Sequence, residues 1–203
     1  MSGTLWLFSS DLERNAAFPD GLPDGVATAI TGVGLVDAGI GTCKAILERM
    51  PERLIFIGTC GAYPESGLKI GEIISATTIS LGSGDTSRGE MRIPGLLPAE
   101  VEVGAGELRE LKNARVVCTL GVTENDGLAF LLGREGDVEN LELFSVARAA
   151  GDIPVAGLLG VTNIVGANGG REWRENYRSV MRSLVMYLRH AKAQRRKVGG
   201  SAL

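Results

Sequence analysis

Short apolar runs recur along the chain and are bounded by glycine, proline or small polar residues. Runs of this length and setting are typical of buried β-strands. The residues predicted as strands are 4–8, 26–30, 54–57, 71–79, 115–120 and 154–161. A helical pattern spans 35–49 and stops before Pro51, and a second one spans 171–193. Apolar strands separated by helices predict an α/β fold, and nothing in the composition divides residues 1–203 into more than one domain.

The stretch 137–144 combines acidic side chains with the start of a helical apolar stripe. The stripe consists of Leu143, Val146, Ala147 and Ala150, at the spacing of one buried helix face. At about 100° per residue, Glu139 falls inside this stripe and Glu142 on its border. Charged groups on a core-facing surface are rare unless they are paired or functional. Two interpretations stay open: functional carboxylates, or a helix start capped by Asp137 and favoured by the acids behind it.

Composition and charge narrow the classes of partner. The chain has 203 residues, of which 44% are hydrophobic and 22% charged, and a formal net charge of −3. This balance provides no field for binding nucleic acid, and the basic run 189–197 is expected to be a solvated end of the last helix. No segment approaches the roughly 18 apolar residues that a membrane span needs. Since no secretory signal pattern is present either, we expect a cytoplasmic protein that does not bind membranes.

Cysteine and histidine usage argues against metal and disulfide chemistry. Cys43, Cys60 and Cys118 are widely spaced, and His190 is the single histidine. These residues fit neither a zinc site of standard ligands nor a disulfide framework. Because no histidine is placed to activate Cys60, we expect it to be a packed side chain rather than a nucleophile.

Three strand ends carry residues that suit a ligand, because ligands of α/β sheets collect beyond the carboxyl ends of the strands. The segment 31–34 contains Gly32 and Gly34 and opens a helix, so its backbone N–H groups either face an anionic or hydroxylated ligand or form a plain tight turn. The segment 58–61 leaves the same two alternatives open. Asn163 ends the last apolar run, where it either points into the crevice or serves as a turn residue.

The order of these segments resembles the purine nucleoside phosphorylase and methylthioadenosine nucleosidase superfamily over residues 4–165. The strongest matches are Gly61-Ala62-Tyr63-Pro64, the run GLKIGEII at 67–74, and VENLE at 138–142. The chain looks most like the futalosine hydrolase branch, whose members are nucleosidases of the menaquinone pathway. That branch commonly reads VENMEG where this chain has VENLEL, and ISN where it has VTN. The resemblance implies a three-layer α/β sandwich with a central twisted mixed sheet.

Members of this superfamily cleave the N-glycosidic bond of a nucleoside through a ribosyl transition state that carries positive charge. The resemblance places Leu141 under the sugar, Glu142 on the ribose hydroxyls and Glu139 in a neighbouring position. A carboxylate suits this task, since it accepts hydrogen bonds from a diol and stabilises positive charge on the ring. The further residues expected to line the substrate are Gly32, Gly34, Thr59, Cys60, Gly61 and Asn125.

Two catalytic positions depart from the nucleosidase pattern. Asn163 stands where nucleosidases carry an aspartate that protonates purine N7. Its amide cannot act as an acid, but it can hydrogen-bond N7 and O6 of a 6-oxopurine, which favours futalosine or inosine over adenosine. The water-activating glutamate corresponds to Glu13 in one alignment and to Asn15 in another, and the second alignment leaves the water without a base.

The superfamily uses either water or phosphate as the nucleophile. Phe56 stands where hexameric phosphorylases carry an arginine, and their N-terminal Gly-Asp-Pro-x-x-Arg pattern is missing, so we expect hydrolysis. Phosphorolysis with a cation from Arg88, Arg92 or another subunit, and a catalytically impaired nucleoside-binding protein, are the alternatives. The resemblance implies no metal or organic cofactor and a homodimer or larger assembly. We also expect residues 82–107, rich in glycine, proline and charge, to form a mobile loop or lid.

Overall fold

Apolar side chains cover both faces of the central strands in the computed structural model, which describes residues 3–95, 100–104, 108 and 110–199. Along β1 (Thr4–Phe8), Leu5 and Leu7 belong to one core cluster, whereas Trp6 and Phe8 belong to another. Strand β3 (Arg53–Ala62) divides its residues between the same two clusters. Because side chains alternate along a strand, this division requires a sheet that is covered on both faces.

The strands join in one mixed sheet with the order β2-β1-β3-β7-β6-β4-β5, and β8 pairs with both β3 and β4. Strands β3, β7, β6, β4 and β8 therefore form a closed ring. The remaining strands are β2 (Ala27–Ile30), β4 (Ile73–Leu81), β5 (Glu100–Glu102), β6 (Lys112–Cys118), β7 (Val138–Asn140) and β8 (Val155–Ile164). The helices are α1 (Asp11–Ala17), α2 (Gly34–Arg49), η1 (Pro64–Ser66), α3 (Gly84–Ser87), α4 (Asp126–Leu132), α5 (Leu143–Ala150) and α6 (Gly169–Gly199).

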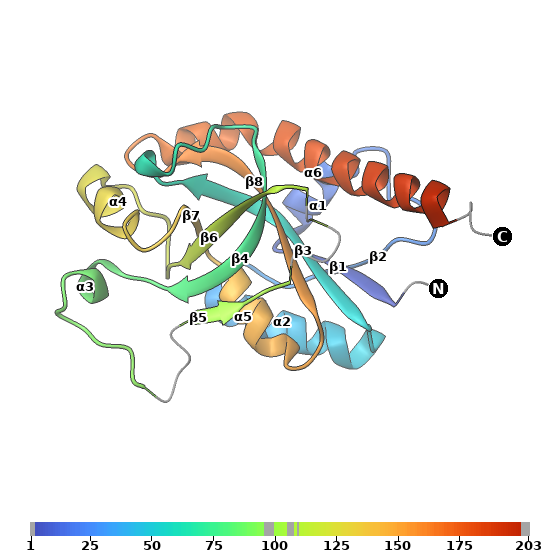
Figure 1. The fold of residues 1–203 in the computed structure, drawn as a ribbon, viewed down its shortest axis with the longest axis horizontal. Coiled ribbons are helices and arrows are strands. Elements are labelled where there is room, and N and C mark those ends of the chain that lie inside the picture. The colour runs from blue at the N-terminus through green and yellow to red at the C-terminus, as the bar shows by residue number, and fades with distance from the viewer. Residues whose placement is uncertain (1–2, 96–99, 105–107, 109, 200–203) are drawn as a thin grey trace.

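Helices cover the two faces of the sheet in separate layers. Figure 1 shows α6 running along one face with α1 against it, while α2 and α5 lie together on the opposite face. The expected three-layer α/β sandwich around a twisted mixed sheet is confirmed. None of the described helices is long and apolar enough to cross a membrane. The side chains of residues 192–199 lie outside the description, and with them Lys192, Arg195 and Arg196 of the basic run.

The prediction of a helix that begins at Asp137 is wrong. Residues 138–140 form strand β7, which pairs parallel with β6 and antiparallel with β3, and α5 begins only at Leu143. The side chain of Asp137 accepts a hydrogen bond from the Arg115 N–H across this pairing and caps no helix. The predicted stripe on α5 is confirmed, because Leu143, Val146, Ala147 and Ala150 are all buried.

Residues 31–34 and 58–61 were both predicted to leave a strand at a turn, and only the first segment does so. Residues 58–61 are not a turn, because β3 continues through them to Ala62 and pairs with β8 along its length. Residues 31–34 do form a turn that opens α2, with φ of +97° at Gly32 and +81° at Gly34. Of the predicted lid, the described part contains α3 and β5, and β5 pairs with β4. Residues 96–99 and 105–107 lie outside the described residues, so the lid stays a prediction.

Two glycines of α2 give a matched test of how tightly this helix packs. A Cβ at Gly41 would lie 1.9 Å from the carbonyl oxygen of Thr31, whereas a Cβ at Gly39 would meet Ser145 at an ordinary 3.6 Å. Backbone cannot rotate away as a side chain can, so Gly41→Ala should lower the free energy of unfolding by about 2 kcal/mol or more. Gly39→Ala should raise it by roughly 0.5–1 kcal/mol through helix propensity. Urea denaturation of both variants measures the difference, and equal effects would contradict this packing.

Candidate active site

A cavity of about 500 Å³ opens where β1, β3 and β8 end. These three strands run parallel, so their carboxyl ends meet at one edge of the sheet, the usual place for a ligand in α/β folds. Strand β7 and the first turns of α6 complete the walls. The lining residues are Ser9, Ser10, Leu12, Glu13, Val33, Thr59, Cys60, Gly61, Val122, Glu139, Asn140, Leu141, Glu142, Thr162, Asn163, Gly169, Gly170, Trp173 and Arg174.

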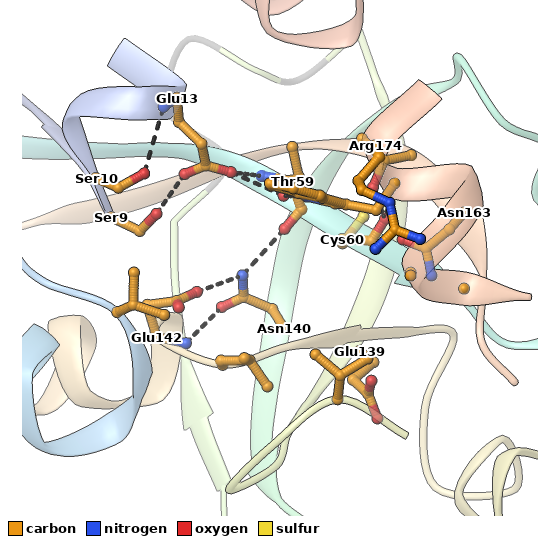
Figure 2. Close-up of a pocket in the computed structure, with 18 of the residues that line it drawn as sticks. Ser9, Ser10, Glu13, Thr59, Cys60, Glu139, Asn140, Glu142, Asn163 and Arg174 are labelled. Atoms are coloured by element: carbon orange, nitrogen blue, oxygen red, sulfur yellow. Dashed lines mark hydrogen bonds between the residues drawn. The ribbon is translucent and has the colours of Figure 1, made fainter. Parts of the chain in front are cut away.

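Glu13 is buried at the start of α1 and its carboxylate is held in a fixed orientation. Ser10 caps the helix by accepting a hydrogen bond from the Glu13 N–H at 3.3 Å. The Ser9 hydroxyl donates to Oε2 of Glu13, and Thr59 donates to Oε1 through its N–H at 3.2 Å and its hydroxyl at 2.8 Å. The indole N–H of Trp173 donates in turn to the Thr59 hydroxyl at 3.1 Å. Three donors thus direct this carboxylate along the cavity wall (Figure 2).

Glu142 lies near Glu13 at the same end of the cavity. Its carboxylate accepts hydrogen bonds from the Gly34 N–H and from Nδ2 of Asn140, both at 3.0 Å. Burial raises the pKa of Glu142 from its ordinary 4.5 to about 7; the Gly34 hydrogen bond opposes this rise, and the negative charge of Glu13 adds to it. The turn that opens α2 therefore directs an N–H group at a carboxylate of the protein itself.

The side chain of Asn140 connects Glu142 to the sheet. Its Nδ2 donates to Oε2 of Glu142 and to the carbonyl oxygen of Thr59, at 3.0 and 3.2 Å. Its Oδ1 accepts from the N–H groups of Glu142 and Leu143, at 2.9 and 2.8 Å. Asn140 rather than Asp137 therefore caps α5, because an asparagine at a strand end can bond the N–H groups two and three residues on.

Glu139 points away from the other two carboxylates, as Figure 2 shows. The N–H of Thr123 donates to its Oε1 at 3.0 Å, and the Thr123 hydroxyl donates to its Oε2. Burial raises the pKa of Glu139, and the hydrogen bonds from Thr123 oppose this rise. Both oxygens are engaged in holding the loop between β6 and α4, so the main interactions of Glu139 are structural although it borders the cavity.

Asn163 reaches the cavity because β8 contains a bulge. The register between β3 and β8 shifts after Cys60, so that Gly61 lies opposite Asn163 and Thr162 is the extra residue. The hydroxyl of Thr162 lies 2.9 Å from Oδ1 of Asn163. A Cβ at Gly61 would lie 2.8 Å from both Nδ2 of Asn163 and Cγ2 of Val165, and a Cβ at Gly169 would lie 3.1 Å from Nδ2, so both glycines pack closely against the amide. With Oδ1 accepting from Thr162, Nδ2 remains as a donor.

The structure brings most of the predicted site residues together and leaves three outside the cavity. Leu141, Thr59, Cys60 and Gly61 line it together with the residues described above. Burial raises the pKa of the Cys60 thiol well above its ordinary value, as expected for a packed side chain. The predicted residues that do not line the cavity are Gly32, Gly34 and Asn125.

Each of these three residues has another structural role. The N–H of Gly32 donates to the Ser9 carbonyl oxygen at 3.0 Å, so this glycine holds the end of β1. Gly34 acts through Glu142, as described above. The Asn125 side chain accepts from the Leu128 N–H at 2.9 Å and caps α4. Asn15, the alternative to Glu13, is exposed on α1 and does not line the cavity.

Neither of the two arginines of this chain that were proposed to bind a phosphate reaches the cavity. Phe56 is fully buried in the core, Arg88 pairs with Asp85 and Glu90 on the surface, and neither Arg88 nor Arg92 is a lining residue. Within the described part of the chain, no group of three histidine, cysteine, aspartate or glutamate side chains is placed to hold a metal ion.

The family model of the phosphorylase superfamily matches residues 24–191. The chain belongs to this superfamily. Among solved structures, native futalosine hydrolase of Helicobacter pylori superposes with a TM-score of 0.78 at 15% identity, over 94% of this chain and 97% of that one. The 5′-methylthioadenosine/S-adenosylhomocysteine nucleosidase of the same organism gives 0.78 at 16%, over 94% and 97%. Arabidopsis thaliana 5′-methylthioadenosine nucleosidase gives 0.73 at 18%, over 94% of each chain.

These identities establish a common fold within the superfamily and no more than the fold. No curated protein matches the chain.

Six polar or aromatic residues of the cavity were not predicted from the sequence: Ser9, Ser10, Asn140, Thr162, Trp173 and Arg174. Ser9 directly follows β1, and a small polar residue at a parallel strand end is itself a signal of a site. Trp173 and Arg174 follow two glycines that open α6 just after the strand that carries Asn163. The signal for them was an aromatic and a basic residue at the start of a helix that adjoins a predicted site.

The raised pKa of Glu142 predicts a pH dependence of stability. The folded state binds this proton more tightly than the unfolded state, so the stabilisation is complete below pH 4.5 and is lost as the pH rises through about 7. At about 1.4 kcal/mol per pH unit, the loss is at most about 3.5 kcal/mol. Glu142→Gln cannot titrate, so its free energy of unfolding relative to wild type should improve by up to that amount between pH 4.5 and 8. Urea denaturation across this range measures it, and a difference that is constant with pH would contradict the assignment.

Proposed function

We propose that this protein is a nucleosidase that hydrolyses the N-glycosidic bond of a purine nucleoside, with a 6-oxopurine base as in futalosine or inosine. The observation that carries the proposal is the distribution of polar groups in one cavity. Two buried carboxylates, Glu13 and Glu142, lie at one end, and the amide of Asn163 lies at the other (Figure 2). Membership in the phosphorylase superfamily and the fold shared with two kinds of nucleosidase support the reaction class.

Glu13 is the group that activates the water in this proposal. Thr59 occupies both lone pairs of Oε1 and Ser9 occupies one of Oε2, which fixes the plane of the group and leaves Oε2 able to accept another hydrogen bond. A water molecule held there gives its proton to Glu13 as its oxygen bonds to C1′ of the sugar. The bond from C1′ to N9 of the purine breaks, and its electron pair leaves with the base.

Glu142 binds the ribose in this proposal, with Leu141 beneath the sugar. Both Glu142 oxygens already accept one hydrogen bond and keep capacity for a sugar hydroxyl. As the bond to the base breaks, positive charge develops on the ring, and a fixed carboxylate stabilises it at no cost of reorganisation. Only the ionised form of Glu142 supplies this effect.

Asn163 selects the base through the atom that it presents. With Oδ1 near the Thr162 hydroxyl, Nδ2 is the group that faces the base edge. N7 and O6 of a 6-oxopurine are both acceptors and suit this donor, whereas the 6-amino group of adenine is itself a donor. This complementarity favours 6-oxopurine nucleosides.

Water is the nucleophile favoured by the charges near Glu13. Of the described residues that line the cavity, Arg174 is the single cation, and Figure 2 places it beside Asn163 rather than beside Glu13. A phosphate dianion next to Glu13 and Glu142 would meet two carboxylates with no cation opposite them, an unfavourable arrangement for an anion.

Incubation of the pure protein with futalosine, inosine, adenosine and methylthioadenosine, with and without phosphate, tests the reaction. Free base should appear without phosphate, and faster from the two 6-oxopurine nucleosides. Glu13→Gln keeps the shape of the side chain but cannot take a proton, so it should lower kcat by about 100-fold or more. Asn15→Ala, on an exposed face of the same helix, is the matched control and should retain wild-type activity.

Three results would contradict this proposal. Release of base only with phosphate would show a phosphorylase. Binding of all four nucleosides without turnover would show a nucleoside-binding protein. Turnover of adenosine at least as fast as that of inosine would remove the argument from the Asn163 amide.

We also propose that the protein forms a homodimer through an exposed apolar stripe on α2. The stripe is defined by six residues at alternating intervals of three and four: Val33, Val36, Ile40, Cys43, Leu47 and Met50. Val36, Leu47 and Met50 are 73%, 80% and 83% exposed. This spacing is that of a helix that packs on another helix, and a copy of α2 across a twofold axis would present the same surface.

Charge placed on the α2 stripe should dissociate the dimer. The variant Ile40→Glu/Leu47→Glu would bury two carboxylates per chain at the interface and should give the mass of a monomer in analytical ultracentrifugation, where wild type gives that of a dimer. Met186→Glu, at another exposed apolar residue on α6, is the control and should remain dimeric. A monomeric wild type, or an unchanged mass in the double variant, would exclude this interface.

A further inference from the structure

Arg174 is the one lysine, arginine or histidine among the described residues of the cavity wall. The other charged residues there are Glu13, Glu139 and Glu142. Within the described part of the chain, the guanidinium of Arg174 forms no hydrogen bond or ion pair, whereas its neighbour Arg171 pairs with Glu175. A charged fork of five N–H donors thus borders the cavity with its hydrogen-bonding capacity unused by the protein.

The position of Arg174 on α6 directs its side chain toward Asn163. The helix begins at Gly169, which packs against Nδ2 of Asn163, and Gly170 lines the cavity one residue later. Arg174 lies four residues after Gly170 on the same helix face, and helical side chains lean toward the N-terminus over the preceding turn. Nothing lies within 4 Å of a Cβ built at Gly170, so the space beneath Arg174 is open. Figure 2 accordingly shows the guanidinium beside the Asn163 amide and away from Glu13.

We propose that Arg174 is a catalytic residue that stabilises the negative charge of the departing purine. This role rests on the nucleosidase function proposed above. When the bond from C1′ to N9 breaks, the purine keeps the electron pair, and in a 6-oxopurine the charge spreads to N7 and O6. Asn163 donates a hydrogen bond there but has no proton to transfer. A guanidinium beside it donates charge-assisted hydrogen bonds to the same edge, and the purine anion later takes its proton from water.

The charge distribution in the cavity supports this role over two others. Binding of a phosphate nucleophile would require a cation near Glu13, where the attacking group must lie, and Arg174 is at the opposite end. Binding of an acidic substituent on the sugar would make Arg174 important only for substrates that carry that substituent. Stabilisation of the leaving base makes it important for every substrate whose base departs as an anion.

Comparison of inosine with 7-methylinosine isolates the charge on the leaving base. The two nucleosides have the same sugar, but the methylated base carries a positive charge in the substrate and departs without becoming an anion. Arg174→Met should lower kcat for inosine by about 100-fold, the usual effect of losing one preorganised electrostatic group, and should leave hydrolysis of 7-methylinosine within a fewfold of wild type. Arg174→Lys keeps the charge and should recover part of the inosine activity.

The controls separate this role from structural and binding roles. Arg171→Met, on an exposed position of the same helix, should change neither rate. Equal losses for both nucleosides in Arg174→Met would show a structural or sugar-binding role and overturn the proposal. A loss confined to KM of substrates with an acidic substituent would assign Arg174 to that substituent instead and also overturn it. If wild type releases no base from any nucleoside, the nucleosidase function itself fails and this role fails with it.

Discussion

The amide of Asn140 is the interaction on which the geometry of the candidate site depends. It makes five hydrogen bonds: two as donor, which exhausts the donors of an asparagine, and three through its oxygen, from two N–H groups and from the Cys118 thiol at 3.9 Å. These bonds join β3, the Glu142 carboxylate and the first N–H groups of α5. The Glu142 carboxylate and the start of α5, which follow Asn140 directly in the chain, are thereby fixed to β3, whose Thr59 is 81 residues away. Because the amide is buried, loss of any partner would leave a polar group unpaired, which maintains a single arrangement.

Two buried carboxylates in one cavity are unfavourable for the folded protein on their own. The raised pKa of Glu142 expresses this cost, to which Glu13 contributes through its charge. The protein offsets it only in part, with three donors on Glu13 and two on Glu142. With the proposed substrate, a neutral nucleoside leaves this imbalance in place, whereas a ribosyl group that gains positive charge relieves it. An environment that favours the charged transition state over the neutral substrate is what catalysis requires.

In the proposed reaction, the cavity is polarised along the direction in which electrons move. Glu13 and Glu142 place negative charge where the sugar becomes positive, and Asn163 and Arg174 place donors where the base becomes negative. Each end lowers the barrier, and the two effects act on the same bond. A chain that lacks an acid at residue 163 can in this way rely on fixed charge instead of proton transfer to the base.

The layers of the fold could be predicted because the central strands are buried on both faces. Strands β3 and β8 therefore appear in the sequence as continuous apolar runs whose ends locate Thr59 and Asn163. Strand β7 could not be predicted, because three residues are too few to establish a period of two. When the apolar stripe of α5 is extended toward the N-terminus of the chain, it assigns residues 138–140 to the helix instead.

Glu13 and Asn140 show a second limit on what can be predicted from the sequence. The helix that carries Glu13 is short, so its register against the rest of the site is settled only by Ser9 and Thr59. Asn140 bonds the carbonyl oxygen of Thr59, which is 81 residues away in the chain. A local sequence pattern cannot identify a hydrogen-bond partner so far away in the chain. Arg174 was missed for a related reason, because a basic residue on an exposed helix face has the same pattern whether it borders a cavity or only solvent.

Helix α2 links the candidate site to the surface of the molecule. Its first N–H, from Gly34, bonds Glu142, and Val33 just before it lines the cavity. The exposed apolar stripe begins at the same Val33 and follows the helix to Met50. In the proposed dimer, a partner bound along this stripe would contact Val33 at the edge of the cavity, next to the turn that holds Glu142. Since the pKa of Glu142 depends on burial and on the Gly34 hydrogen bond, association of two chains would change the electrostatics of the site as well as its access.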